Sequence, residues 1–160
     1  MKKIAIFIVS LLCYFAAKSQ RISVNTGWSV SIPVGTITEA GNDYSSSVTS
    51  PIAQTLIDFK TINSNIYAIS VQKVDIDWHP NLSVWVQRNG DGSGSGGPTV
   101  PMTGGTTFIQ VTNTPQSFFF DPSGSSHNRN NVPIQYRILG YSVLLPVKTY
   151  TTTVVYTISN

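Results

Sequence analysis

The sequence predicts an all-β antiparallel sandwich that is closed without a disulfide bond. After the first 19 residues Thr, Ser, Val and Ile dominate, whereas Ala, Leu, Glu and Lys, which favour helices, are scarce. Apolar residues recur at every second position in short windows, and clusters of Gly, Pro, Asn and Ser separate these windows. Short strands at this spacing favour a sandwich or barrel over βαβ units. Residues 20–160 are numerous enough to bury roughly two-thirds of their unfolded surface, so a core needs no disulfide.

Residues 1–19 have the pattern of a secretory signal peptide. Lys2 and Lys3 form a basic start, residues 4–17 are almost entirely apolar, and small residues stand at Ala17 and Ser19. The apolar run is shorter than the ~20 residues of a membrane-spanning helix, although a stably inserted anchor is the alternative. We expect cleavage after Ser19, which leaves residues 20–160 as one domain. The protein is therefore expected to be exported to the periplasm, the cell surface or the extracellular space.

The only cysteine, Cys13, lies inside this segment. The exported domain is therefore expected to have no disulfide, although its compartment would allow one. Lipid attachment at Cys13 is disfavoured because Leu12, and not a small residue, precedes it.

Charge patterning disfavours nucleic acid as a partner. The chain has ten Lys and Arg against seven Asp and Glu, and three of the lysines lie in the export segment, so the exported domain is formally neutral. Binding to a phosphate backbone requires a concentrated basic surface, which the sequence does not contain. The charged fraction of 11% is also less than half the ~25% that is usual for soluble domains. We expect no nucleic-acid partner and no membrane span in the exported chain.

The first windows with a strand pattern are 22–25 and 28–33. Their alternating apolar side chains are Ile22, Val24, Trp28, Val30 and Ile32. β-branched and aromatic residues predict further strands at 53–60, 66–78 and 82–88. The remaining windows are 106–112, 116–120, 132–139 and 150–159. The last alternates most regularly and has Tyr150, Thr152, Val154, Tyr156 and Ile158 on one face. Polar stretches at 41–50, 89–101 and 121–131 are expected to be loops at the ends of the sandwich.

Matching side-chain parity suggests a hairpin between 74–78 and 82–86. A three-residue loop at 79–81 would place Val74 opposite Val86 and Ile76 opposite Val84, with their side chains facing inward. The alternative is that the two windows belong to different sheets joined by a corner. Because the apolar parity changes between Val71 and Val74, we expect a β-bulge near residues 72–73.

Three consecutive aromatic residues occupy positions 118–120. They cannot all face one side of a regular strand, so either Phe119 or both Phe118 and Phe120 must point outward. An element that covers this edge is therefore expected.

Few residue patterns in the chain match a reactive site. Asp75, Asp77 and His79 alternate along one strand, about 7 Å apart per step, but no further ligand has a matching spacing, so we prefer a solvated outer face. Residues 89–92 lack the acidic ligands of a calcium loop, and the glycine-rich stretch lacks the Gly-Lys-Ser/Thr of a phosphate loop. The middle residue of 92–96 is Gly94, so the stretch is not a nucleophile elbow. We expect no enzyme, no metal site and no cofactor.

The strongest binding hypothesis from single residues is a carbohydrate site at Trp85. If Val84 and Val86 face inward, Trp85 faces outward and the hairpin register places it opposite Asp75. An exposed indole flanked by Asp77 and Gln87 can stack on a sugar ring while carboxylates bind its hydroxyls. The alternatives are that a loop or a neighbouring subunit covers this face, or that the strand is buried on both sides.

The C-terminal sequence resembles a family of secreted subunits. Residues 132–140, Val-Pro-Ile-Gln-Tyr-Arg-Ile-Leu-Gly, are followed by 145–158, Leu-Pro-Val-Lys-Thr-Tyr-Thr-Thr-Thr-Val-Val-Tyr-Thr-Ile. They resemble the last two strands of pilin-like, spore-coat-U-like immunoglobulin-like domains, with Lys148 where glycine is usual. The resemblance implies an immunoglobulin-like β-sandwich and a non-enzymatic surface or fibre component.

Such families can complete their sandwich with a strand from a neighbouring subunit. By this resemblance the candidate donor is the N-terminal stretch with Ile22, Val24, Trp28, Val30 and Ile32. The same residues can instead form an intramolecular first strand, which is the interpretation we prefer.

The sequence as a whole predicts an exported structural or adhesive subunit that acts through strand pairing and burial of apolar faces. Copies of the chain or related surface subunits are the expected partners. The alternative is a secreted carbohydrate-binding module with Trp85, Asp75, Asp77 and Gln87 at its site, and a polysaccharide as its partner.

Overall fold

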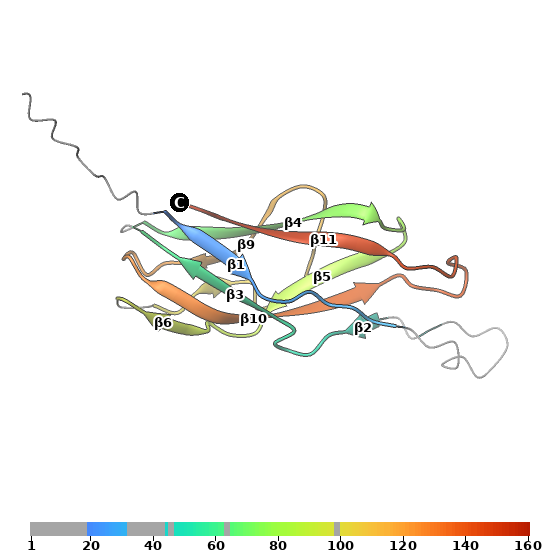
Figure 1. Ribbon diagram of the computed structural model, residues 1–160, viewed down its shortest axis with the longest axis horizontal. Helices are drawn as coiled ribbons and strands as arrows, with labels where there is room; N and C mark the ends of the chain where they lie inside the picture. Colours follow the sequence, from blue (N-terminus) through green and yellow to red (C-terminus); the bar gives the residue numbers. More distant parts are fainter. Residues whose placement is uncertain (1–18, 32–43, 45–46, 63–64, 98–99) are drawn as a thin grey trace, which may run out of the picture.

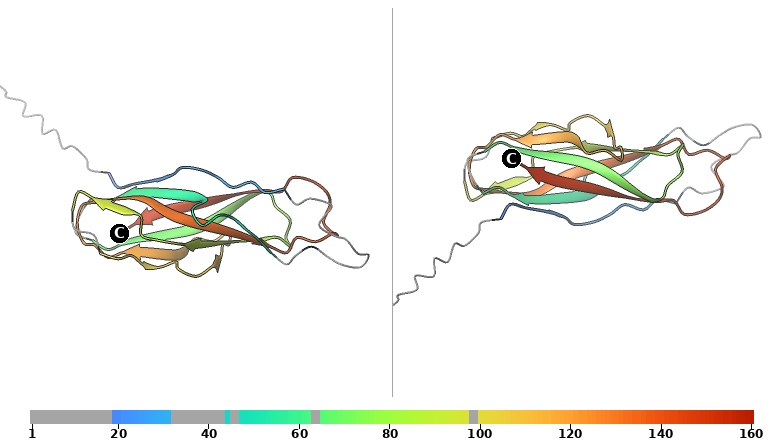
Figure 2. Two further views of the ribbon diagram at one scale, coloured as in Figure 1. Left: turned by 90° about the horizontal axis from the view of Figure 1, so that it is seen from below. Right: turned by 90° about the horizontal axis from the view of Figure 1, so that it is seen from above.

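The computed structural model describes residues 19–31, 44, 47–62, 65–97 and 100–160. These residues form eleven strands and no helix, and the strands form two antiparallel sheets (Figure 1). Seen from its two edges, the molecule consists of two layers (Figure 2). The predicted all-β, antiparallel, disulfide-free fold is confirmed. The predicted signal peptide lies outside the described residues, apart from Ser19.

Sheet A has seven strands and is built around β10 (Asn128–Leu139). Its order is β1 (Arg21–Val24), β3 (Thr55–Lys60), β10, β5 (Ser83–Arg88) and β8 (Ile109–Gln110). Two short strands, β2 (Ser47–Thr49) and β6 (Ser93–Ser95), pair with opposite halves of β10. Consequently β10 has a partner on both sides along most of its length.

Sheet B has four strands in the order β11 (Thr151–Ser159), β4 (Tyr67–Asp77), β9 (Gln116–Asp121) and β7 (Thr103–Gly104). The predicted inward face of the last strand is confirmed, because Tyr156 and Ile158 are buried and Val154 packs against the core. Strand β11 lies at the open edge of this sheet, where β4 is its paired neighbour.

The core lies between the two sheets. Apolar side chains of β3, β5 and β10 face those of β4, β9 and β11, and Phe59 and Phe119 meet across the interface with their ring centroids 6.3 Å apart. The Tyr156 hydroxyl donates a 3.1 Å hydrogen bond to the Tyr136 hydroxyl from the opposite sheet. The two sheets are therefore joined by packing and by a buried polar contact.

A bulge in β10 turns two side chains, Arg129 and Val132, toward the same side of the sheet. Residues 130 and 131 together oppose Asp58 of β3, and Asn131 has a positive φ of 58°. Its backbone N–H donates to the Asp58 carboxylate at 2.7 Å. Because the bulge adds one residue, Arg129 and Val132 both point into the core despite their odd separation.

A second bulge explains the run of three phenylalanines. Phe118 is the extra residue of β9 between Ser117, which opposes Ser70, and Phe119, which opposes Ile69. Phe118 and Phe119 are therefore both buried, and only Phe120 is exposed, at 40%. The expected strict alternation of these three side chains was wrong, since it assumed a regular strand.

The expected hairpin between 74–78 and 82–86 was wrong, and the alternative of two different sheets is correct. Strand β4 pairs with β11 and β9, whereas β5 pairs with β10 and β8. The inward parity of β4 continues through Lys73, so Val74 and Ile76 are exposed at 50% and 70%. The register shift lies at Ile76 and not at residues 72–73. A turn from His79 to Leu82 carries the chain from one sheet to the other.

Two expected strands are shorter or absent. Of 28–33, the described residues 28–31 are not in a strand, and Ile32 lies outside the described residues. Of 106–112, only β8 is a strand. Conversely, the Gly/Ser-rich stretch contains β6, which Gly92 makes possible: its φ is +65°, and a Cβ there would lie 2.3 Å from the Asn130 carbonyl oxygen.

Candidate functional site

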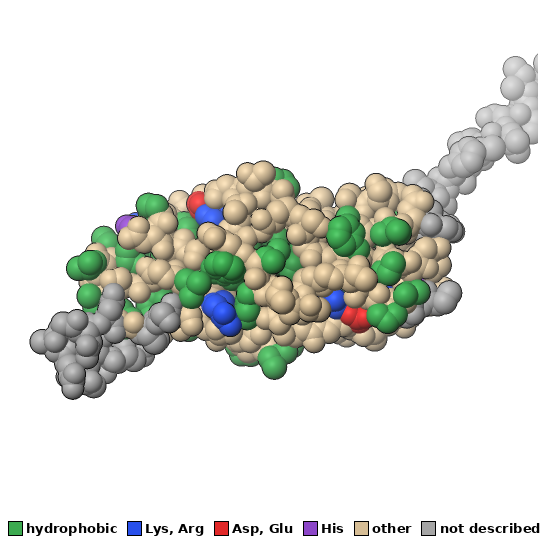
Figure 3. All heavy atoms as spheres, turned by 180° about the vertical axis from the view of Figure 1, so that it is seen from behind, with side chains coloured by type: hydrophobic (Ala, Val, Ile, Leu, Met, Phe, Trp, Pro, Cys, Tyr) green, Lys and Arg blue, Asp and Glu red, His purple; other side chains and the backbone are tan. Residues whose placement is uncertain are grey.

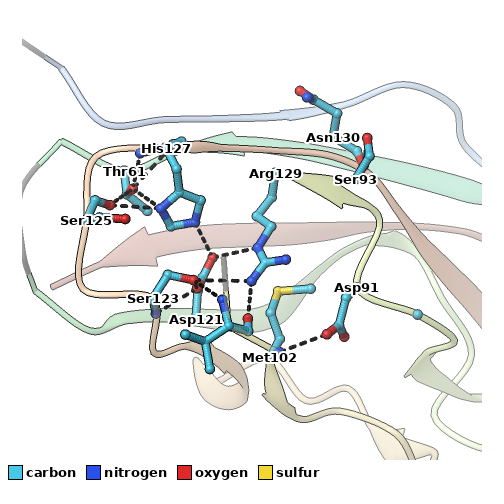
Figure 4. A network of polar contacts seen from close by, with 12 residues as sticks. Thr61, Asp91, Ser93, Met102, Asp121, Ser123, Ser125, His127, Arg129 and Asn130 are labelled. Carbon is cyan, nitrogen blue, oxygen red and sulfur yellow. Dashed lines mark hydrogen bonds and ion pairs between the residues drawn. The ribbon is translucent and has the colours of Figure 1, made fainter. Parts of the chain in front are cut away.

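A buried polar network at one end of the sandwich is the most concentrated group of titratable side chains in the described part of the chain (Figure 4). Asp121 ends β9, Arg129 stands near the start of β10, and His127 precedes that strand. Thr61 directly follows β3. The network therefore joins both sheets and the connection between β9 and β10.

The Asp121 carboxylate is the centre of this network. Its Oδ2 accepts a 3.0 Å hydrogen bond from Arg129 Nε and lies 2.8 Å from His127 Nε2, while Oδ1 accepts from the Ser123 hydroxyl at 2.6 Å. Burial raises the pKa of Asp121, but hydrogen bonds from Arg129, Ser123 and His127 outweigh it and hold the pKa below its ordinary value of 3.8. The carboxylate is thus stabilised in its charged form.

Thr61, His127 and Asp121 follow one another as hydroxyl, imidazole and carboxylate do in a nucleophilic triad. Thr61 Oγ1 lies 3.0 Å from His127 Nδ1, but it also donates to the Ser125 carbonyl oxygen at 2.7 Å and accepts from the His127 backbone N–H at 3.0 Å. The three residues are at most 3% exposed. A hydroxyl without access to a substrate cannot attack one, so this geometry is that of a clamp that fixes the β9–β10 connection.

A second buried arginine, Arg88, binds residues 90–91 on one side and residues 102–104 on the other. Its guanidinium donates to the carbonyl oxygens of Gly90, Met102 and Gly104 and forms an ion pair with Asp91. Sequence reasoning missed the role of Arg88, although it occupies the same inward parity as Val84 and Val86. Arg129 was missed because it precedes the expected start of its strand.

The structure separates the residues of the predicted carbohydrate site. Trp85 and Gln87 lie on β5 of sheet A, whereas Asp75 and Asp77 lie on β4 of sheet B. The expected pairing of Trp85 with Asp75 was therefore wrong, because it followed from the incorrect hairpin. Trp85 instead opposes Arg137 of β10 on one side and Gln110 of β8 on the other.

The two aspartates are occupied by neighbours in sheet B. Asp75 forms an ion pair with Lys73 and accepts hydrogen bonds from Asn113 and Thr152. Partial burial raises the pKa of Asp75, but the contacts with Lys73, Asn113 and Thr152 lower it by more. The pKa of Asp75 is therefore below its ordinary value. Asp77 pairs with Lys148. Both aspartates are exposed, and each is bound by these neighbours rather than by Trp85 or Gln87.

Trp85 nevertheless stands on the outer face of its sheet, since its neighbours Val84 and Val86 are buried at 4% and 0% exposure. The indole is half-buried, and its Nε1 donates to the Ser83 hydroxyl at 3.0 Å. The Arg137 guanidinium lies 3.9 Å from the centre of the Phe108 ring. Phe108 was not among the predicted site residues, and the outward parity of Arg137 in the 132–139 window was the available signal.

The candidate first strand pairs within its own chain. β1 lies along β3, with Ile22 opposite Phe59 and Val24 opposite Ile57. Trp28 stacks on Tyr136 with an interplanar angle of 13°, while Val24 and Val30 are 47% and 39% exposed. The Gln20 side-chain amide also donates to the Ile158 carbonyl oxygen of β11 at 3.3 Å. The N-terminal segment therefore adds the edge strand β1 to sheet A and lies beside β11, the edge strand of sheet B.

Within the described residues, no group of three or more His, Cys, Asp or Glu side chains is placed to hold a metal ion. The same part of the chain contains no helix with the length and apolarity needed to cross a bilayer. On the face seen in Figure 3, charged side chains are few and hydrophobic ones are scattered among polar ones. That face has no concentrated basic surface.

Comparisons with protein-family models, with curated proteins and with solved structures find no match for the chain.

Proposed function

We propose that the protein is an exported, non-enzymatic structural or adhesive subunit with an immunoglobulin-like sandwich, and that it assembles by strand pairing at the free edge of β11. The observation that carries this proposal is the position of β11. It is nine residues long, it ends the order of sheet B, and β4 is its partner among the described strands. One side of its backbone is thus available to a further strand.

The composition of β11 supports the same conclusion. Soluble proteins protect long edge strands with lysines, prolines or inward-pointing charges. The sequence Thr-Thr-Thr-Val-Val-Tyr-Thr-Ile-Ser contains none of these, and its residues have high β-propensity. Gln20, which directly precedes the four-residue β1, donates a hydrogen bond to the Ile158 carbonyl oxygen of β11. β1 itself pairs with β3 and not with β11.

A charge placed on the β11 edge tests this function. We expect the chain from Gln20 to Asn160, which contains every described strand, to form concentration-dependent assemblies in light scattering. Thr153→Lys, at an exposed position of β11, should shift the mass toward the monomer with little change in melting temperature. Thr114→Lys, at an exposed loop position, is the matched control and should assemble like the unmodified chain. A strictly monomeric chain at all concentrations, or equal effects of both substitutions, would contradict assembly through β11.

A further inference from the structure

The outer face of sheet A carries Arg137, which has no acidic partner in the part of the chain that the structure describes. Lys73, Arg88, Arg129 and Lys148 each form an ion pair with an aspartate. Arg137 has no such pair among the described residues; its Nε donates to the Thr49 hydroxyl at 3.2 Å, and its two terminal nitrogens have no acceptor there. A half-buried guanidinium with free donors is suited to a planar, negatively charged group.

This guanidinium is held in a fixed orientation. The Phe108 ring supports one of its flat faces at 3.9 Å, and the Thr49 hydroxyl binds its Nε. Since Arg137 stands on β10 and Phe108 directly precedes β8, the side chain reaches across β5. Its free donors are therefore pre-organised, which reduces the entropy that a ligand must overcome.

Trp85 lies beside this arginine. It is the register partner of Arg137, and paired residues of antiparallel strands project from the same face with Cβ atoms about 5 Å apart. Its only polar atom is bound to Ser83, so the ring is fixed and its exposed part is apolar. An aromatic ring in this position can pack against the apolar face of a sugar.

Two amide side chains extend this face. Gln110 is exposed opposite Trp85, and no described residue binds its side chain. Gln87 donates its amide N–H to the Thr106 carbonyl oxygen, which leaves its side-chain oxygen without a described donor. Both side chains can exchange hydrogen bonds with hydroxyl groups. A long ligand with many hydroxyl groups and a carboxylate fits this face. Its carboxylate can bind Arg137, and its hydroxyl groups can bind the amides of Gln87 and Gln110.

We propose that the outer face of sheet A around Trp85, Phe108 and Arg137 binds an acidic polysaccharide, with a sugar ring on Trp85 and its carboxylate on the Arg137 guanidinium. Gln87 and Gln110 bind the hydroxyl groups of neighbouring sugar units. The site does not involve β11, so a test of polysaccharide binding and a test of the proposed assembly can succeed or fail independently.

Affinity electrophoresis of the chain from Gln20 to Asn160 tests this site. The gels contain polygalacturonate, alginate or hyaluronan, with dextran and fully methyl-esterified pectin as uncharged counterparts. We expect at least one of the acidic polymers to retard the protein and the uncharged ones to have little effect. Trp85→Ala and Arg137→Gln should each weaken the binding about tenfold or more, because each removes a separate contact. Arg137→Lys, which keeps the charge but loses the planar fork, should also weaken it several-fold.

Two substitutions are matched controls. Arg21→Gln removes the same charge from an exposed position of β1, and Phe120→Ala removes an exposed aromatic ring from sheet B. Both should leave the retardation within about twofold of the unmodified chain, and circular dichroism confirms that each variant is folded. If Trp85→Ala fails to fold, Arg137→Gln and Arg137→Lys decide, since their side chains lie outside the core.

Several outcomes would overturn the site. One is the absence of retardation by all three acidic polymers. Another is an equal loss in Arg21→Gln and Arg137→Gln, which would indicate non-specific charge attraction. Retardation by poly-glutamate but by none of the polysaccharides would assign the face to acidic polypeptides instead.

Discussion

At the residue scale, the buried charges of this domain are neutralised by specific partners. Asp121 and Arg129 are both nearly inaccessible, and each is bound by the other. Burying either charge alone would be expensive, because an isolated ion loses its hydration without compensation. Ser123 and His127 supply further hydrogen bonds to the two oxygens of the Asp121 carboxylate. This network therefore makes the end of the sandwich sensitive to acid.

Acid should destabilise the domain through Asp121. Its pKa is lower in the folded chain than its ordinary value of 3.8, so the folded state binds fewer protons than the unfolded state in that range. The stabilisation is fully present above the ordinary value and is lost as the pH falls through the lowered pKa. Melting temperatures measured from pH 7 down to about pH 2.5 should fall most steeply below about pH 4.

The Asp121→Asn variant isolates this contribution. It should cost about 3 kcal/mol of unfolding free energy at pH 7, because Arg129 is left buried without its counter-charge. Its acid dependence should be flatter than that of the unmodified chain. An identical steepness in both proteins would assign the acid sensitivity to other carboxylates, such as Asp75.

At the element scale, bulges decide which side chains of a strand reach the core. The bulge at Asn131 aligns Arg129 with Val132, and the bulge at Phe118 buries two consecutive aromatic rings. Each bulge adds one residue to a strand and so reverses its parity. A residue at a positive φ is tolerated at such a point when it is Asn or Gly.

Substitutions at Asn131 should measure the conformational demand of the β10 bulge. The side chain is exposed, and its backbone φ of 58° is strained for β-branched residues. We expect Asn131→Gly to change the unfolding free energy by less than about 0.5 kcal/mol and Asn131→Val to cost about 2 kcal/mol. Urea unfolding midpoints would test the difference. Equal stability of the two variants would mean that the bulge relaxes without strain.

At the scale of the whole molecule, the fold depends on two sheets that each bury one face. Neither sheet can bury its apolar side chains alone, so their stabilities are linked. Tyr156 of β11 and Tyr136 of β10 belong to this shared interface, and burial, together with the neighbouring Tyr136, raises the pKa of Tyr156 well above 10.0. The Tyr156 hydroxyl therefore stays neutral and donates its hydrogen bond to the Tyr136 hydroxyl across the sheets.

A charge at Tyr156 should therefore unfold the whole domain. Tyr156→Asp places an unpaired carboxylate in the core, and we expect loss of cooperative unfolding in circular dichroism melts. Tyr156→Phe removes only the hydroxyl and should cost about 1 kcal/mol. Thr157→Asp is the matched control, since Thr157 is exposed on the same strand. A folded Tyr156→Asp variant would contradict the assignment of the β11 inner face.

The sequence by itself determined the local properties of this protein. Alternation with period two is set by the backbone of a single strand, so β11, β5 and the inner face of β10 were predictable from their own residues. The outward position of Trp85 followed in the same way from Val84 and Val86.

Only the tertiary structure decided which strands pair, and hence which side chains meet. The corner after His79 sends β4 and β5 into different sheets, which removes Asp75 and Asp77 from Trp85 and brings Arg137 and Phe108 to it. Pairing and bulges depend on the burial of both sheets together, a non-local free energy that no single window contains. For this reason the strands could be predicted from the sequence, whereas the grouping of Trp85, Phe108 and Arg137 could not.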